Sequence, residues 1–211
     1  MANPKPKYLA TTRYIKGMLQ LATVADIEQG KQWYKRAYNL AITLMHSYKG
    51  VTLGQCVGVI AALSPNNKWE RNCNDAEAMI KAWANGCDPT SVKVCTFNKN
   101  KEKAAAILNL DDDFTTEDIE RILNGRKVVA FYRCIMGFDD AVCVDGHAYA
   151  IWLGERVPTT KTPSIGIKLY ETISRAYINT AAVSFDLVGE SLTPAQVQAV
   201  TWVTYRRLLG Y

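Results

Sequence analysis

Long apolar runs are missing from this sequence. No stretch of its 211 residues approaches the roughly 20 consecutive apolar residues that a membrane-spanning helix needs. The N-terminal segment, residues 1–14, is basic but lacks the apolar region and small-residue cleavage site of a secretory signal. We therefore expect a cytoplasmic protein with no membrane partner.

Several ligand-binding signatures are missing as well. The six cysteines have no closely spaced pairs, which indicates free thiols in a reducing compartment. Neither they nor the two histidines show a spacing that suits zinc. The sequence also lacks the Gly-rich phosphate loop typical of nucleotide hydrolysis. These absences predict a protein without a bound metal and without a cofactor.

The charge balance is only mildly basic. The chain carries 25 Lys and Arg against 20 Asp and Glu, for a net charge of +5 and an isoelectric point of about 8.8. Such a surface permits a polyanionic partner but does not require one. With 48% hydrophobic residues, the chain can bury a core as one domain or as two small packed lobes.

Helical periodicity runs along almost the whole chain. Between residues 34 and 48, for example, apolar positions recur at the i, i+3, i+4 spacing of an amphipathic helix. Strand signals are confined to short β-branched pieces such as residues 92–97. A threonine that precedes a glutamine by three positions, or that precedes acidic residues, marks a helix start. The N-caps expected on this basis are Thr52, Thr116 and Thr193. The pattern predicts an all-α protein.

Two of the predicted helices are joined by a tight turn at Asn124 and Gly125. A short loop that runs into a helix N-terminus presents backbone N–H groups at the positive end of the helix dipole, which suits a phosphate of a nucleic-acid backbone. Arg126 and Lys127 would add counter-charge. The other interpretation is an ordinary pair of helices joined by a glycine-containing turn.

Lys127 lies in the first turn of the helix that follows this hairpin. The helix dipole disfavours a cation there, and enclosure in a closed site would disfavour it further. A neutral lysine amine can attack the C1′ carbon of a sugar and form a Schiff base. The alternative is an exposed lysine whose aliphatic stem packs on the hairpin.

Asp145 precedes another predicted helix and follows an apolar pair of residues. Its simplest interpretation is an N-cap, yet a carboxylate at this place can also face a cleft and stabilise positive charge that develops on a sugar ring. His147, two residues later, fits an orienting or packing role better than that of a general base.

The order and spacing of these residues resemble the helix-hairpin-helix (HhH-GPD) DNA glycosylase superfamily, especially its endonuclease-III-like branch. That branch has a hairpin ending in Gly-x-Lys, followed by a Val-Asp-x-His box. Residues 125–127 match the first element and residues 144–147 the second. The separation between Lys127 and Asp145 also matches that branch.

Elements upstream of the hairpin align in the same order. The segment "VIAALSPNN" resembles the family's apolar helix and the Ser-x-Gln loop that enters the duplex where a base has left, with Asn66 at the glutamine position. The resemblance therefore makes Asn66 and Asn67 candidate DNA contacts. Trp69, in the same predicted loop, is either a wedge beside an extruded base or an anchor in the core. The whole match covers roughly residues 54–155.

The resemblance implies a two-lobed fold with a cleft between the lobes. Residues 1–52 and 156–211 would form a terminal helical lobe, and residues 53–155 a helical lobe containing the hairpin. The protein would be a monomer that binds double-stranded DNA, flips out one nucleotide and cleaves its N-glycosidic bond without a cofactor. Lys127 would be the nucleophile of a Schiff-base lyase step and Asp145 its carboxylate partner. The sequence does not identify the base.

The chain departs from the glycosylase pattern in two places. The hairpin, residues 121–125, lacks the proline and the first glycine of the usual Leu-Pro-Gly-x-Gly sequence. No cluster of four cysteines follows Asp145, which excludes the iron–sulfur cluster of many relatives. The chain as a whole resembles small proteins carried by bacteriophages, and a protein of that kind would act in the host cytoplasm.

That second resemblance leaves a rival function open. Some bacteriophage members of the superfamily are thought to modify thymine-derived bases, exchanging an activated group at the pyrimidine 5-position for an amine or amino acid. The same base-flipping cleft would serve, and Lys127 with Asp145 would activate a leaving group. A third interpretation is a DNA-binding protein without catalytic activity.

Overall fold

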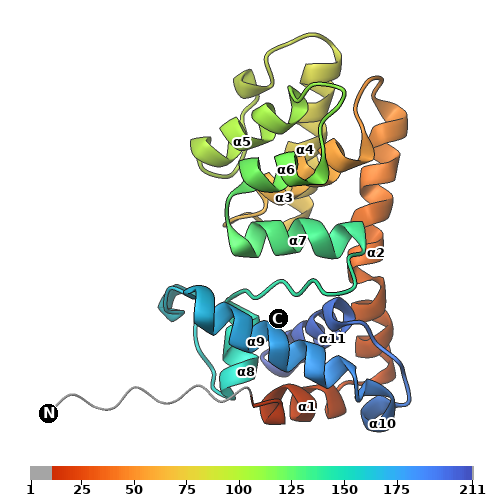
Figure 1. Cartoon of the computed structure of the whole chain (residues 1–211), viewed down its shortest axis with the longest axis vertical. Coiled ribbons are helices and arrows are strands. Elements are labelled where there is room, and N and C mark those ends of the chain that lie inside the picture. Colours follow the sequence, from red (N-terminus) through yellow and green to blue (C-terminus); the bar gives the residue numbers. More distant parts are fainter. Residues whose placement is uncertain (1–10, 211) are drawn as a thin grey trace, which may run out of the picture. The chain divides into compact units, whose positions relative to one another are not determined.

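The helical periodicity of the sequence carries through to the structure, a computed structural model that describes residues 11–210. Within this range the chain forms eleven α-helices and two short 3-10 turns and has no strand (Figure 1). The prediction of an all-α protein is confirmed. The β-branched segment 92–97 adopts irregular backbone instead of a strand.

The helices follow one another with short connections. The two 3-10 turns lie at Pro89–Ser91 and Thr159–Lys161. The α-helices are α1 Arg13–Gln20, α2 Val24–Ser47, α3 Leu53–Leu63, α4 Trp69–Ala84, α5 Asn98–Leu108, α6 Thr116–Leu123, α7 Arg126–Met136, α8 Gly146–Leu153, α9 Ile167–Ala181, α10 Ser184–Val188 and α11 Pro194–Leu208.

The described residues divide into two compact units. The terminal unit comprises residues 11–34 and 139–210, and the middle unit comprises residues 35–138. The sequence-based division placed its boundaries after residues 52 and 155 instead. The later turns of α2 therefore belong to the middle unit, and α8 with the segment before it belongs to the terminal unit. The two ends of the predicted terminal lobe, residues 1–10 and 211, lie outside the described residues.

The middle unit is built around α3. Nine consecutive residues of this helix, 55–63, are buried, as expected of a helix that is apolar on every side. The predicted capping box is present, because the Thr52 hydroxyl accepts from the Gln55 backbone N–H at 3.2 Å and the Gln55 side chain accepts from the Thr52 N–H at 2.9 Å. The Gln55 amide also donates to the carbonyls of Ile107 and Leu108 at the end of α5.

The start of α6 lies one residue earlier than predicted. The sequence suggested Thr116 as the N-cap, but Thr116 is the first helical residue and Thr115 is the N-cap. The reason is the position of Asp118, which stands three residues after Thr115 and accepts its backbone N–H at 2.8 Å. The Thr115 hydroxyl donates to the same carboxylate oxygen at 2.7 Å. These bonds lower the Asp118 pKa to about 2, the backbone N–H contributing most.

The terminal unit packs α8 and α11 as its most buried helices. Five residues of α8, 148–152, are buried, and so are most of those along α11. Two tyrosines of α9 fix the chain that enters α8. The Tyr170 hydroxyl donates to the Val142 carbonyl at 2.9 Å and accepts the Val144 N–H at 3.1 Å. The fully buried Tyr177 donates to the Ala148 carbonyl at 3.4 Å, and burial raises its pKa.

Candidate functional site

The predicted hairpin is present in the middle unit between α6 and α7. Helix α6 ends at Leu123, and Asn124 adopts the left-handed conformation with φ of 41°. Gly125 is extended, with φ of −171°, and occupies the N-cap position of α7. No side chain caps the start of α7, and its first turn contains no acidic residue. The start of α7 therefore has neither a side-chain cap nor a carboxylate in its own first turn to offset the positive end of the helix dipole.

Two contacts hold the hairpin in this shape. The Lys103 ammonium, from α5, donates to the carbonyl of Leu123 at the end of α6, where a cation is favourable for the helix dipole. Arg133 of α7 forms a two-pronged ion pair with Glu120 of α6, with N–O distances of 2.6 and 3.2 Å. Burial, together with the neighbouring Lys99, lowers the pKa of Lys103.

Lys127 follows the hairpin as predicted, in the first turn of α7. Its side chain is exposed, as are those of Asn124 and Arg126. Lys127 belongs to the middle unit and Asp145 to the terminal unit. The expectation that these two groups converge on one cavity therefore stays a prediction.

Asp145 is the N-cap of α8, as its simplest interpretation held. One carboxylate oxygen accepts the Ala148 backbone N–H at 2.8 Å. The other lies 3.6 Å from the Nδ1 atom of His147. The two side chains are 29% and 26% exposed, so both remain accessible. The structure thus brings Asp145 and His147 together as a carboxylate–histidine pair. The orienting role of His147 stays a prediction.

Aromatic rings from α11 surround this pair. The His147 ring meets Trp202 edge to face, with centroids 6.4 Å apart, and Tyr205 at 6.0 Å. The Arg206 guanidinium lies 4.6 Å above the Trp202 ring. The sequence pattern did not identify these residues as site candidates, because the segment that forms α11 resembles nothing catalytic in the glycosylases. The available signal was the i, i+3 spacing of Trp202 and Tyr205, which places both rings on one face of the helix.

The loop between α3 and α4 presents Asn66 at its exposed tip. Asn66 has φ of 57°, a left-handed conformation that asparagine tolerates better than most residues. Asn67, the other predicted contact in this loop, turns inward and donates to the buried carboxylate of Asp75 at 2.9 Å. Trp69 is half-buried at the first position of α4. Asn66 is therefore exposed, whereas Asn67 braces the loop.

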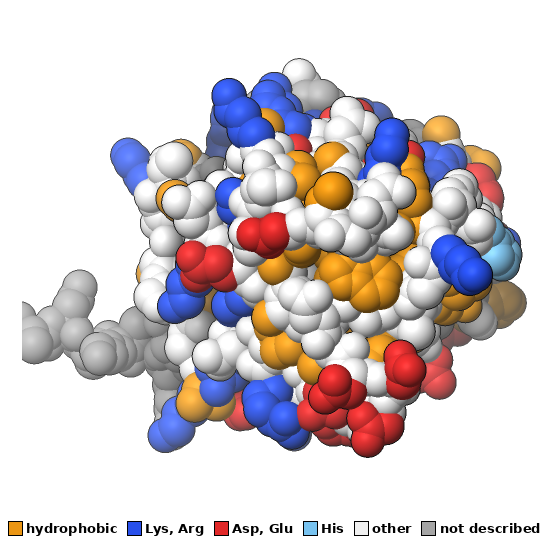
Figure 2. Space-filling model, turned by 90° about the horizontal axis from the view of Figure 1, so that it is seen from above, with side chains coloured by type: hydrophobic (Ala, Val, Ile, Leu, Met, Phe, Trp, Pro, Cys, Tyr) orange, Lys and Arg blue, Asp and Glu red, His pale blue; other side chains and the backbone are white. Residues whose placement is uncertain are grey.

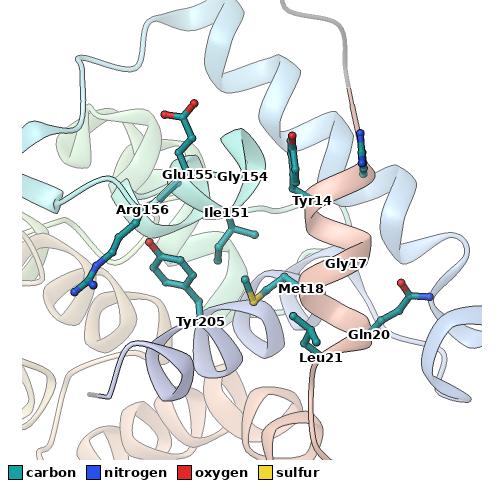
Figure 3. A pocket seen from close by; sticks show the side chains of 12 residues that line it. Tyr14, Gly17, Met18, Gln20, Leu21, Ile151, Gly154, Glu155, Arg156 and Tyr205 are labelled. Carbon is teal, nitrogen blue, oxygen red and sulfur yellow. The ribbon is translucent and has the colours of Figure 1, made fainter.

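A pocket of about 590 Å³ opens in the terminal unit between α1, α8 and α11. Figure 3 shows Met18, Ile151 and Tyr205 directed toward one another, with the charged side chains of Glu155 and Arg156 diverging from them. The volume is within the range of small-molecule sites. Tyr205 lines this pocket and also contacts the His147 ring. No pattern in the sequence indicated this pocket.

Basic and acidic side chains are mixed on the face of the protein that Figure 2 shows. Figure 2 shows Lys and Arg side chains at several separate places on one face, with one group of Asp and Glu side chains at the lower right and others among the basic ones. Apolar side chains occupy its centre. This face therefore lacks the continuous basic surface of a strong polyanion binder.

Residues 11–210 contain no group of three or more His, Cys, Asp or Glu side chains arranged to hold a metal ion. In the same range, none of the helices is long and apolar enough to cross a membrane. The six cysteines are free thiols, and burial raises the pKa of Cys56 to about 12 and that of Cys73 to about 11. Neither of these two thiols is suited to act as a nucleophile near neutral pH.

The fold and these sites together define an all-helical protein with an exposed basic hairpin and a carboxylate–histidine pair. Its sequence matches the DUF7178 family, a family of unknown function, over residues 5–208. The chain belongs to this family. No curated protein and no solved structure matched it.

Proposed function

We propose that this protein binds duplex DNA through the α6–α7 hairpin and acts on one nucleotide flipped out of the helix. The observation that carries the proposal is the uncapped start of α7, which has no acidic residue in its first turn and is followed by the exposed Arg126 and Lys127. Backbone N–H groups at a helix N-terminus suit a phosphate, and the two cations add attraction.

The chemistry proposed for the flipped nucleotide is cleavage of its N-glycosidic bond. The Lys127 amine would bond to C1′ while the C1′–N bond breaks and the base leaves with the electron pair. The sugar ring would then open as the C1′–O4′ bond breaks and O4′ takes up the proton that the nitrogen loses. This gives a C1′=N Schiff base, which water hydrolyses. Asp145 would stabilise the positive charge that develops on the sugar. This assignment rests on the resemblance to the endonuclease-III-like glycosylases and requires the two groups to meet in the DNA complex.

Borohydride trapping tests the lysine directly, because hydride reduces a Schiff base to a stable amine. Wild-type protein incubated with duplexes carrying damaged or modified bases should form a covalent adduct, and Lys127→Ala should form none. Lys81→Ala, which removes another exposed lysine of the middle unit, should trap as well as the wild type. An adduct that persists in Lys127→Ala, or no wild-type adduct with any duplex, would refute the glycosidic mechanism.

Asp145→Asn tests the proposed role of the Asp145 carboxylate. Asparagine is as good an N-cap as aspartate, so Asp145→Asn should preserve the bond to Ala148 and the fold while removing the charge. A large loss of adduct with unchanged thermal stability is expected. Analysis of the bases and nucleosides after incubation then separates the reactions: a released base supports cleavage, whereas an altered base on an intact sugar points to modification.

A second candidate is a DNA-binding protein without catalytic activity. Two observations favour it: Lys127 is exposed, and one oxygen of Asp145 is already engaged as a helix cap. In that case Asp145→Asn would leave every property unchanged. Arg126→Gln should still weaken DNA binding and reduce the slope of log affinity against log salt by about 0.9 if Arg126 neutralises one phosphate. A slope equal to that of the wild type would mean that the hairpin is not the contact.

A further inference from the structure

Phe97 is an exposed aromatic residue at the start of α5 in the middle unit. It is the N-cap residue of that helix, and 64% of its surface is accessible. A single exposed apolar side chain is ordinary on a protein surface, so the exposure gains meaning only from what surrounds it. Two features do so: hydrogen bonds that hold the two residues before Phe97, and a helix start with two lysines directly after it.

The support comes from bonds that join the Phe97 segment to the Asn66 loop. The Asp75 carboxylate accepts the backbone N–H of Cys95 at 2.8 Å and the side-chain amide of Asn67 at 2.9 Å, both at the same oxygen. The Thr96 hydroxyl donates to the Pro65 carbonyl at 2.9 Å. Residues 95–97 and 64–67 are therefore tied together at two points.

The consequence is that two exposed side chains share one edge of the unit. Phe97 directly follows Thr96, and Asn66 directly follows Pro65, the residues that the 2.9 Å bond joins. Asn66 is held in the left-handed conformation at an exposed tip. A buried carboxylate with two internal donors fixes both loops, so neither needs to become ordered when a partner binds.

The first turn of α5, directly after Phe97, is basic, and the exposed Glu102 follows that turn. The first turn of α5, residues 98–101, contains two lysines and no acidic residue, and no side chain caps it. Lys99 is exposed. Lys101 is partly balanced by Asp88, whose pKa it helps to lower. Further along the same helix, Lys103 bonds to the Leu123 carbonyl of the hairpin, so α5 connects this edge to the proposed DNA contact.

We propose that Phe97 is a stacking residue that receives an unpaired base of bound DNA, with Lys99 and the start of α5 beside the adjoining phosphate. An aromatic ring next to a basic surface is the combination that binds unstacked bases, because the ring stacks on the base while the cations attract the backbone. Trp69, which the sequence suggested as either a wedge beside an extruded base or a core anchor, is half-buried. The inference rests on the proposed DNA binding and adds to it a residue outside the hairpin.

Phe97→Ala tests the inference against a matched control. Phe185, on α10 of the terminal unit, is also 64% exposed, so Phe185→Ala removes the same ring at equal exposure elsewhere. Fluorescence anisotropy would measure affinity for a labelled duplex with one central mismatch. Phe97→Ala should weaken binding roughly fivefold to a hundredfold, whereas Phe185→Ala should change it less than about twofold. Phe97→Trp should restore binding and Phe97→Leu should not.

Salt dependence separates stacking from a general loss of structure. Because Phe97 carries no charge, Phe97→Ala should leave the slope of log affinity against log salt unchanged, whereas Lys99→Gln should reduce it by about 0.9. If the wild type binds the duplex and Phe97→Ala matches Phe185→Ala, the stacking role is wrong and the hairpin proposal survives. If the wild type does not bind any DNA, both fall.

Discussion

Replacement of Gly30 by alanine is expected to destabilise the terminal unit by about 1–3 kcal/mol. Gly30 lies on α2 where that helix crosses α11. A Cβ atom added to Gly30 would lie 2.5 Å from the Val200 Cα atom and 2.6 Å from its backbone nitrogen. Both are main-chain atoms, so no rotation of a side chain relieves the clash. The two helices would have to move apart, and the packing beside them would be lost.

Gly17 provides the matched control for this substitution. It lies within α1 of the same unit, and a Cβ added there would meet nothing within 4 Å. Alanine also loses less backbone entropy than glycine on folding, so Gly17→Ala should raise stability by roughly 0.5–1 kcal/mol. Urea unfolding monitored by far-ultraviolet circular dichroism measures both. Equal stability of Gly30→Ala and the wild type would show that the two helices are not packed this closely.

Local signals in the sequence predicted much of the helical framework. The capping boxes at Thr52 and Thr193 formed as expected. Helix α3 ends before Pro65, and glycines with positive φ follow α4 and α11 at Gly86 and Gly210. Each signal acts within one helical turn, so sequence neighbours are enough to recognise it. The wrong N-cap prediction at α6 has a local cause as well, because the adjacent Thr115 and Thr116 both precede acidic residues and only one of them can be the N-cap.

Contacts between segments that are distant along the chain could not be predicted from these local signals. The approach of Gly30 to Val200 depends on how two helices cross, and one sequence does not specify a crossing angle. The unit boundaries in the structure differ from the expected ones for a related reason, because the assignment of α8 depends on its packing against α1 and α11. Helix periodicity shows which face is buried but not which partner buries it.

The candidate site likewise contains some arrangements of sequence neighbours and some contacts between distant residues. The hairpin with Arg126 and Lys127, and the cap formed by Asp145, are arrangements of sequence neighbours and could be predicted. The rings of Trp202 and Tyr205 beside His147 could not, since more than fifty residues separate them along the chain. The proposed role of Phe97 could not be inferred from the sequence, because it is argued from bonds of Asp75 and Thr96 to residues distant along the chain.

Removal of the Arg207 guanidinium is the second substitution expected to have a large effect on stability. Arg207, near the end of α11, forms a two-pronged contact with Asp26 of α2, with distances of 3.1 and 2.9 Å from its Nε atom to the two carboxylate oxygens. It also donates to the Leu21 carbonyl at 3.0 Å. Asp26 is only 4% exposed, so removal of its partner would leave a buried carboxylate with fewer donors.

The expected cost of Arg207→Gln at neutral pH is about 1–3 kcal/mol. Breaking a fully buried pair costs about 3–5 kcal/mol, and the 42% exposure of the Arg207 side chain reduces that figure through solvent screening. The more exposed pair of Lys31 and Glu190, 3.0 Å apart, provides a comparison. Lys31→Gln should lower the unfolding free energy much less.

The pH dependence of stability reports on the same pair. Burial alone would raise the pKa of Asp26, but hydrogen bonds from Arg207 and Thr23 outweigh it and hold the pKa below its usual value of 3.8. A carboxyl whose pKa is lower in the folded state stabilises the protein above its unfolded pKa, and this contribution is lost as the pH falls through the folded pKa. For Asp26, the loss should begin near pH 4 to 5 and continue below 3.8.

Arg207→Gln should change how steeply the unfolding free energy varies with pH, in addition to lowering that free energy at neutral pH. Burial raises the pKa of Asp26, and without the guanidinium only the bonds from Thr23 oppose that effect. The pKa of Asp26 in the folded state therefore rises. The unfolding free energy of the variant should therefore fall less steeply than that of the wild type as the pH drops from 5 toward 3, and the two curves should approach each other at the acid end. Parallel curves would mean that Asp26 does not draw its stabilisation from Arg207. Urea titrations at several pH values, with Asp26→Asn as the variant that cannot titrate, make this comparison.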